Sequence, residues 1–220
     1  MRLRHFPKIA IFALLAALLA GCASSGKGAR SEVLGEAEHL DNLETLWNAL
    51  DRSIRERNHA LFEQLVTQES YDWLDTLILS IERMPEEDLR ERPFEEMFIV
   101  LGVRFLYRNH EIDSYHRDDV LPAVMAQRPL DKMFARKDLG EFWYEDDRAW
   151  RGLKRASGVP LFCFAKENNA WKLDLRQTLS KVLRGFESVG AKKQIDLPDA
   201  VIYILDRHPR YEADRSLLRP

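Results

Sequence analysis

The chain has few cysteines and no long hydrophobic run. Cys22 and Cys163 are its only two cysteines, so a framework of disulfides cannot hold the fold together. The apolar stretch at residues 9–19 would span about 17 Å as a helix, whereas the hydrocarbon core of a bilayer is about 30 Å thick. A permanent transmembrane helix is therefore not expected there.

An excess of basic residues is also missing. The chain has 33 Lys and Arg against 36 Asp and Glu, a formal net charge of −3. The two signs are interspersed, as in residues 83–92. Nucleic-acid-binding proteins present a strongly basic surface to the phosphates. No nucleic-acid partner is expected, and the mixed charges indicate a solvated surface.

Patterns typical of common catalytic sites are absent from the sequence as well. It contains no glycine-rich phosphate loop, no Gly-x-Ser-x-Gly elbow and no His-Glu-x-x-His helix. Cys163 lies in the apolar run Phe162-Cys163-Phe164, with no His or Asp beside it. Because a reactive thiolate needs a polar or cationic neighbourhood, this run predicts a buried, unreactive thiol.

The amino terminus does carry the pattern of an export signal. Three basic residues precede the apolar stretch, which ends at Leu19-Ala20-Gly21-Cys22. A basic segment, a short apolar segment and small residues at a cleavage point are typical of a secretory signal peptide. The four-residue motif resembles the lipobox of bacterial lipoproteins. The resemblance implies cleavage before Cys22, diacylglycerol on its sulfur and a further acyl chain on the new amino terminus.

Residues 1–21 are therefore expected to be a lipoprotein signal peptide. Residues 22–38 are expected to be a lipid-anchored tether, which begins with a stretch rich in Ser, Gly and Ala. Loss of three basic residues with the signal changes the formal net charge from −3 to −6. Several acyl chains hold a protein on a membrane where one chain is marginal, so Cys22 is the predicted lipid attachment site and the bilayer its partner.

The residue after Cys22 indicates to which membrane the lipoprotein is sorted. In enterobacterial lipoproteins, which this terminus resembles, retention at the inner membrane goes with Asp at that position. Ala23 therefore favours the outer membrane, with the domain facing the periplasm. The outer face of the cytoplasmic membrane is the alternative, and applies to a Gram-positive host.

Hydrophobic spacing predicts helices in the first part of the domain. The first helix is expected to begin at Asp41, with Glu44 completing a capping box, and to end at Asn58. Further helices are expected over residues 61–65, 71–81, about 93–107 and about 118–127. The apolar residues 97–103 of the fourth could alternatively form a buried strand.

Strand-forming residues cluster after Leu139 between short turn signals. Strands are expected over residues 142–144, 149–153, 159–165 and 171–175. In the last, Trp171, Leu173 and Leu175 share an apolar face, which is typical of an antiparallel sheet with one side buried. Helices ending near Gly190 and covering residues 199–206 follow. The sequence thus predicts an α+β fold.

Three segments of the strand-rich region after Leu139 resemble a known family. They are Asp-Asp-Arg-Ala-Trp at 146–150, Gly-Val-Pro-Leu-Phe-Cys-Phe-Ala-Lys-Glu at 158–167, and Ala-Trp-Lys-Leu-Asp-Leu at 170–175. They look like the end of a nuclear transport factor 2-like, or SnoaL-like, domain of small bacterial lipoproteins. The resemblance implies a curved antiparallel β-sheet of about four or more strands, covered by amino-terminal helices, over residues 39–190. Residues 191–220 would then form a carboxy-terminal helical extension. The helical segment at 85–137 departs from that family.

The polar residues most suited to form a functional site are His110, Asp113 and His116. On a continuous helix both imidazoles would approach the one carboxylate, as in a metal site or an acid–base pair. The turn-forming Asn109 and Ser114 favour a polar connector instead. No catalytic residue, cofactor or metal is therefore predicted.

Two functions compete at this point. The first is a membrane-anchored, non-enzymatic module that binds an envelope protein, an envelope polymer or a small apolar ligand. The alternative is an isomerase- or dehydratase-like enzyme with its site in a cavity. Some members of the family that this chain resembles catalyse such reactions in a cone-shaped cavity with paired His and Asp. The aromatic residues Phe142, Trp143, Tyr144 and Trp150 could line such a cavity, but are expected mainly to plug the core.

Overall fold

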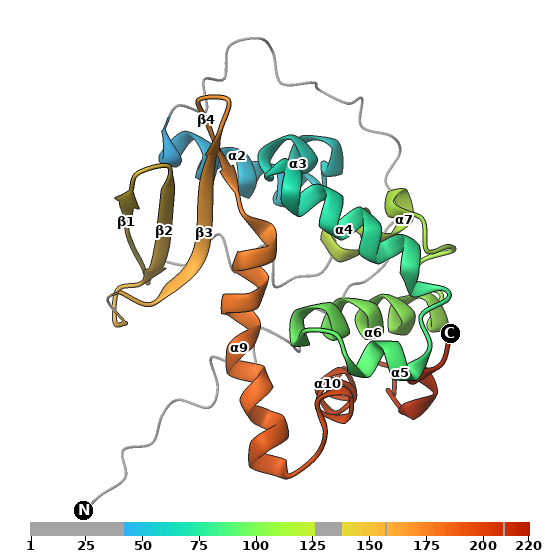
Figure 1. Cartoon of the computed structure of the whole chain (residues 1–220). Coiled ribbons are helices and arrows are strands. Elements are labelled where there is room, and N and C mark those ends of the chain that lie inside the picture. The colour runs from blue at the N-terminus through green and yellow to red at the C-terminus, as the bar shows by residue number, and fades with distance from the viewer. Residues whose placement is uncertain (1–41, 126–137, 157, 209) are drawn as a thin grey trace, which may run out of the picture.

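The computed structural model describes residues 42–125, 138–156, 158–208 and 210–220 (Figure 1). The lipobox, Cys22 and the expected tether lie outside the described residues. The fold is α+β, as predicted: helices precede and follow a four-stranded, curved antiparallel sheet. None of the described helices is both long enough and apolar enough to span a membrane.

The first three described helices are α2 (Leu43–Glu56), α3 (His59–Leu65) and α4 (Gln68–Ile81). Each begins at a polar cap whose side chain accepts a hydrogen bond from a backbone N–H three residues on: Asn42, Asn58 and Thr67. The cap of α2 is thus Asn42, one residue after the expected Asp41. Asn58, expected to end α2, opens α3 instead, and Arg57 in the left-handed region closes α2.

The next helices are α5 (Glu86–Arg90), α6 (Phe94–Arg108) and α7 (Arg117–Met125). The sequence predicted α6 and α7 but not the single-turn α5. Residues 97–103 form helix, which resolves the alternative in favour of α6. Pro93 precedes the first turn of α6, and Glu95 and Glu96 lie at its positive end.

The sheet consists of β1 (Leu139–Glu145), β2 (Arg148–Leu153), β3 (Pro160–Glu167) and β4 (Ala170–Leu173), in that order. All three pairings are antiparallel. The register shifts between Arg151 and Gly152. A Cβ at Gly152 would lie 2.2 Å from the Val159 carbonyl oxygen, so only glycine fits this irregularity.

Helix α9 (Leu175–Lys193) follows β4 directly, because Asp174 caps its first turn. Leu175 therefore belongs to α9 and not to the strand, which was expected to be longer. Helix α9 also continues past Gly190 to Lys193. It lies against β3, where the Cys163 N–H donates to the Thr178 hydroxyl at 3.0 Å (Figure 1).

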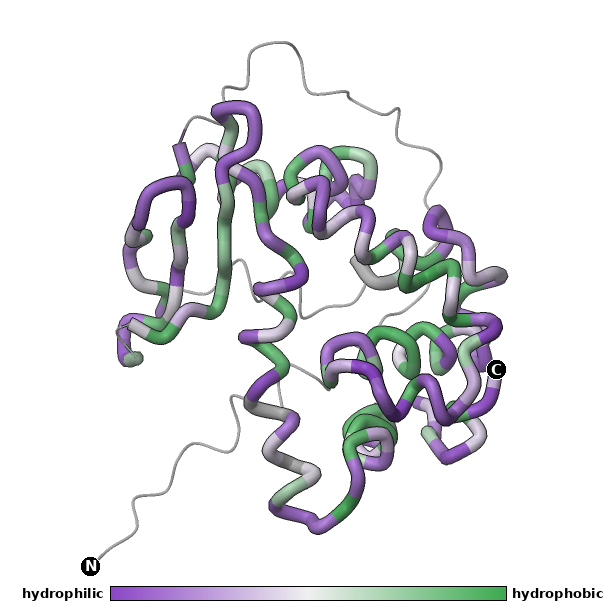
Figure 2. Tube along the Cα trace, viewed as in Figure 1, coloured by the Kyte–Doolittle hydropathy of each residue, from purple (hydrophilic) through white to green (hydrophobic). Residues whose placement is uncertain are grey.

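Two hydrophobic cores lie side by side. One joins α2 and α3 to the sheet and includes Leu46, Trp47, Leu50, Trp171 and Leu173. The predicted packing of the last strand with the first helix is thus confirmed. The second core joins α4, α6, α9, α10 (Leu197–Leu205) and the 3-10 helix η1 (Arg215–Leu218). Figure 2 shows α10 as a largely hydrophobic segment of this core.

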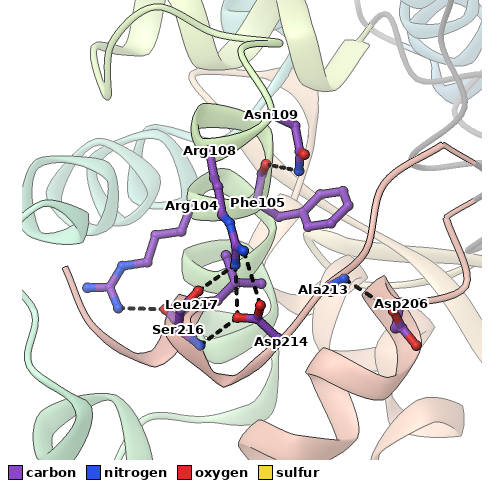
Figure 3. A network of polar contacts seen from close by, with 9 residues as sticks. All are labelled: Arg104, Phe105, Arg108, Asn109, Asp206, Ala213, Asp214, Ser216 and Leu217. Atoms are coloured by element: carbon purple, nitrogen blue, oxygen red, sulfur yellow. Dashed lines mark hydrogen bonds and ion pairs between the residues drawn. The ribbon is translucent and has the colours of Figure 1, made fainter.

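The segment beyond α9 is fixed to α6 by a polar network (Figure 3). Arg108 binds both carboxylate oxygens of Asp214, at 2.9 and 3.0 Å. The buried Arg104 donates to the carbonyls of Ile81, Met84 and Leu217. The expected boundary after Gly190 falls inside α9, and the residues after it complete the core around α6.

Candidate functional site

The space between α2 and the sheet is filled by aromatic side chains. The Trp47 ring of α2 stands edge-on to Phe162, with centroids 4.8 Å apart, and lies 6.4 Å from Phe164. Phe142 of β1 lies 6.2 Å from Trp47 and 5.6 Å from Phe164. These rings fill the space between α2 and the sheet.

The Arg151 side chain occupies the same space. Its guanidinium lies 4.6 Å from the Trp47 ring centroid and 4.4 Å from that of Phe142. Its Nε donates to the Gly140 carbonyl at 3.0 Å. Burial lowers the pKa of Arg151 below its ordinary value. The cation is therefore held between two aromatic faces, where cation–π attraction offsets part of its lost hydration.

The predicted polar candidates do not assemble into a site. His110, Asp113 and His116 are all exposed on the connector between α6 and α7. The helix ends at Arg108 and His110 takes a left-handed conformation (φ 56°), so the spacing that would have aligned the three side chains is lost. Within the described ranges no group of three His, Cys, Asp or Glu side chains is placed to hold a metal ion.

Ser114, expected to cap the next helix, instead forms hydrogen bonds in the connector just before α7. Its hydroxyl accepts the His116 N–H at 3.0 Å and donates to the Asp119 carboxylate. These bonds hold the first turn of α7. The connector is thus a folded polar turn.

A small cavity lies between α3, α4, α7 and the start of α9. The open space inside it measures about 10 Å³. Its walls are mainly apolar and comprise Phe62, Val66, Tyr71, Leu74, Leu121 and Leu175, with Glu63, Asp75 and Arg117. Arg117 pairs with Glu63 at 3.2 Å and Asp75 at 3.4 Å, and lies 4.9 Å from the Tyr71 ring centroid. Small-molecule sites measure about 300–1,000 Å³, and one water needs about 10–15 Å³. This cavity therefore has room for a water molecule at most.

The other face of the sheet carries a different arrangement. Trp143, Trp150 and Cys163 are successive cross-strand partners, so they form one row across β1, β2 and β3. Helix α9 covers the Cys163 end of this row. The two indoles at the other end are stacked, with centroids 6.5 Å apart and planes at 25°. Both are only half-buried and belong to neither hydrophobic core.

The expectation that four aromatic residues plug the core is therefore wrong for three of them. Phe142 packs against the core, but Trp143 and Trp150 point to the opposite face and Tyr144 is 61% exposed. Strand alternation explains the two tryptophans, because neighbouring residues of a strand face opposite sides. Tyr144 shares the side of Phe142 but stays exposed close to the hairpin turn. Gly152 leaves room beside Trp143, whose ring tip comes within 3.2 Å of where a Cβ would lie.

Charged residues flank the two indoles. Glu145 and Arg148 are cross-strand partners next to the turn, and the alternation puts them on the same side as Trp143 and Trp150. We call these four residues the tryptophan face. Flat aromatic rings beside charged groups are enriched at sites where proteins bind partners.

Cys163 does not contribute a reactive thiol to this face. Its side chain is buried, as predicted. Burial first, and the Asp174 charge second, raise the pKa of Cys163 to about 11, while Lys181 and Arg148 oppose the shift. The thiol therefore stays protonated at neutral pH.

The hairpin sequence contained a signal for the tryptophan pair. Trp143 and Trp150 are equally distant from the Asp146-Asp147 turn. A tight hairpin centred there places them opposite each other. Comparisons of the chain with protein-family models, with curated proteins and with solved structures gave no match.

Proposed function

We propose that this chain is a lipid-anchored binding protein of the bacterial envelope. Acylated Cys22 holds it at the outer membrane, and the domain faces the periplasm. There it binds an envelope polymer through the tryptophan face and catalyses no reaction of its own. The lipobox motif supports the anchor, and the two faces of the sheet support the mode of binding.

The observation that carries the binding proposal is the contrast between those faces. The side toward α2 is filled by Trp47, Phe162 and Phe164, at ring distances of 4.8 and 6.4 Å from the indole. The opposite side leaves the Trp143 and Trp150 rings partly exposed. Contiguous apolar patches on a surface often mark binding sites, so we take the two neighbouring indoles as the surface that a partner covers.

The geometry favours a polymer over a small apolar ligand. A small apolar ligand needs an enclosed pocket, whereas the cavity beside Arg117 offers about 10 Å³. Trp143 and Trp150 instead offer a partly exposed apolar surface made of two indoles, and Glu145 and Arg148 offer polar groups beside it. Successive sugar rings of a glycan have this combination of apolar faces and polar edges.

Sedimentation with purified peptidoglycan sacculi tests the proposal. The lipidated chain in detergent micelles should pellet with the sacculi, and the double variant Trp143→Ala/Trp150→Ala should lose at least tenfold in affinity, about 1.4 kcal/mol. Tyr107→Ala is the matched control, since it removes another exposed aromatic ring, 42% exposed, on α6.

Two outcomes contradict the polymer. The wild-type chain could stay in the supernatant, or the double variant could pellet as well as the wild type. Loss of an envelope protein from cross-linked complexes of the double variant, with unchanged sacculus binding, would assign the face to a protein partner.

A further inference from the structure

The tryptophan face continues beyond its two indoles into a charged row. Arg148 lies two residues from Trp150 on β2, so the two side chains leave the sheet on the same side, about 7 Å apart along the strand. Arg148 is the cross-strand partner of Ala165 on β3, as Trp150 is of Cys163. The exposed Arg148 side chain therefore stands in the row next to the Trp150 indole.

A second cation reaches this side of the sheet from α9. The Thr178 hydroxyl of α9 accepts the Cys163 N–H, and Lys181 follows Thr178 by one helical turn, on the same side of the helix. Burial and the Asp174 charge raise the pKa of Cys163. Lys181 and Arg148 both oppose that shift, so both positive charges act on the same thiol. The end of the tryptophan row that α9 covers is thus approached by cations from two elements.

Both cations lack a carboxylate partner among the described residues. No Asp or Glu oxygen there lies within 4 Å of the Arg148 guanidinium or of the Lys181 ammonium. Asp174 instead caps the first turn of α9. Glu145, the cross-strand partner of Arg148, lies on the edge strand β1, on the side away from α9. The face is therefore negative at its β1 edge and positive toward α9.

Fold stability does not account for these two positive charges. Arg148 lies on a strand and Lys181 in the middle of α9, so neither is at a helix end where the dipole favours a cation. On α9, the positions three and four residues from Lys181 hold no acidic residue. A partly exposed indole with cations beside it matches an acidic glycan, whose sugar rings pack on the indole and whose carboxylates accept charge-assisted hydrogen bonds.

We propose that the polymer bound by the tryptophan face is an acidic glycan, one whose sugars or attached peptides carry carboxylates, and that Arg148 and Lys181 select it. A sugar ring packs on Trp150, and a carboxylate beside that ring binds the two cations. Glu145, at the far edge, faces neutral hydroxyl or amide groups of the sugar over Trp143. This selectivity rests on the proposed binding of a polymer by the tryptophan face, and it names the class of that polymer.

Sacculi with blocked carboxylates test the selectivity. Purified peptidoglycan sacculi are used unchanged, or after carbodiimide coupling of their carboxylates to ethanolamine, which leaves neutral amides on the same polymer. Sedimentation of the lipidated chain in detergent micelles gives the affinity for each preparation. The wild-type affinity should fall at least about fivefold on the amidated sacculi, as expected for the loss of two exposed ion pairs. Added salt should weaken binding to the native sacculi toward the amidated level.

Matched variants separate the two cations from general charge attraction. Arg148→Gln/Lys181→Gln should bind native sacculi as weakly as the wild type binds amidated sacculi, and amidation should change its affinity by less than about twofold. Lys154→Gln/Arg155→Gln removes the same amount of charge from two exposed residues at the other end of β2. This control variant should keep the wild-type preference for native sacculi.

Three results would overturn the selectivity while leaving the proposed function in place. They are equal binding of the wild type to native and amidated sacculi, an undiminished preference in Arg148→Gln/Lys181→Gln, and an equal loss of preference in Lys154→Gln/Arg155→Gln. The last result would assign the preference to the overall charge of the chain. A wild-type chain that stays in the supernatant with both preparations would instead contradict the proposed function itself.

Discussion

The indole of Trp47 stands edge-on to the ring of Phe162, with centroids 4.8 Å apart and planes at 87°. One residue comes from α2 and the other from β3, so this contact joins the first described helix to the middle of the sheet. An edge-to-face pair of this kind adds about 0.5–1.5 kcal/mol beyond the area that it buries. It also fills part of the space between α2 and the sheet.

Trp171 in β4 completes the same core and provides a stability test. Its side chain is 6% exposed and shares the core with Leu46 and Leu50. Trp171→Ala should lower the free energy of unfolding by about 3–5 kcal/mol, the usual cost of deleting a large buried aromatic side chain. Urea unfolding measures this loss, and Trp150→Ala, at a partly exposed residue, is the milder control. An unchanged midpoint for Trp171→Ala would mean that the sheet face is assigned backwards.

Arg104 should matter more to stability than its neighbour Arg108. Arg104 is buried and donates to three backbone carbonyls from α4, the following turn and η1. Arg104→Leu leaves these acceptors without a donor and should cost about 3 kcal/mol. Arg108→Ala removes an exposed ion pair with Asp214 and should cost under about 1 kcal/mol. Equal losses in thermal or urea unfolding would contradict the difference in burial.

His208 should make the stability depend on pH. It is buried, stacks on Tyr211 at 4.9 Å and accepts the Arg210 N–H at Nδ1. Burial, followed by the Arg210 charge, lowers its pKa below the ordinary 6.5, although Glu111 opposes the shift. The unfolded chain therefore takes up a proton that the folded chain resists. Stability is fully present above about pH 6.5 and declines as the pH falls toward the lowered pKa.

The His208→Gln variant should show a flatter stability curve between about pH 7 and pH 5. His116→Gln, a change at an exposed histidine, should keep the wild-type slope. Urea unfolding at several pH values gives both curves. Parallel curves for His208→Gln and the wild type would show that another group titrates.

Much of the fold could be predicted from the sequence because the patterns that indicate its helices and strands are local. The helical spacing of apolar residues in α2 and the alternation of apolar and polar residues in β4 each indicate which side is buried. Together they predict an α+β fold. Helix α6 was ambiguous with a strand because it is buried nearly all round, including Met97, Leu101 and Val103. A helix without a polar stripe has no readable period.

Other features depend on contacts between distant residues. The pairing of Arg104 with Leu217 joins residues 113 positions apart, and no pattern near either residue indicates it. The His110–His116 candidates failed because their alignment required a helix that ends at Arg108. The tryptophan pair was readable from its symmetry about the hairpin turn, but which face α9 leaves uncovered required the three-dimensional arrangement.

The proposed lipid anchor predicts a specific biochemical phenotype. The wild-type chain should partition into the detergent phase of a two-phase extraction, with a mass at Cys22 that includes its acyl chains. Cys22→Ser should accumulate as an unlipidated precursor, because the modified sulfur is gone. Recovery of the wild-type chain in the aqueous phase would contradict the lipoprotein proposal.

The central claim is that the tryptophan face binds the partner, and the indole N–H resonances test it most directly. The chain has five tryptophans. Trp47 and Trp171 are buried, and the Trp73 N–H donates to Glu96 at 2.9 Å. On addition of soluble peptidoglycan fragments, the resonances of Trp143 and Trp150 should shift while the other three stay in place. No shift at Trp143 and Trp150, or shifts confined to the other three, would contradict the account.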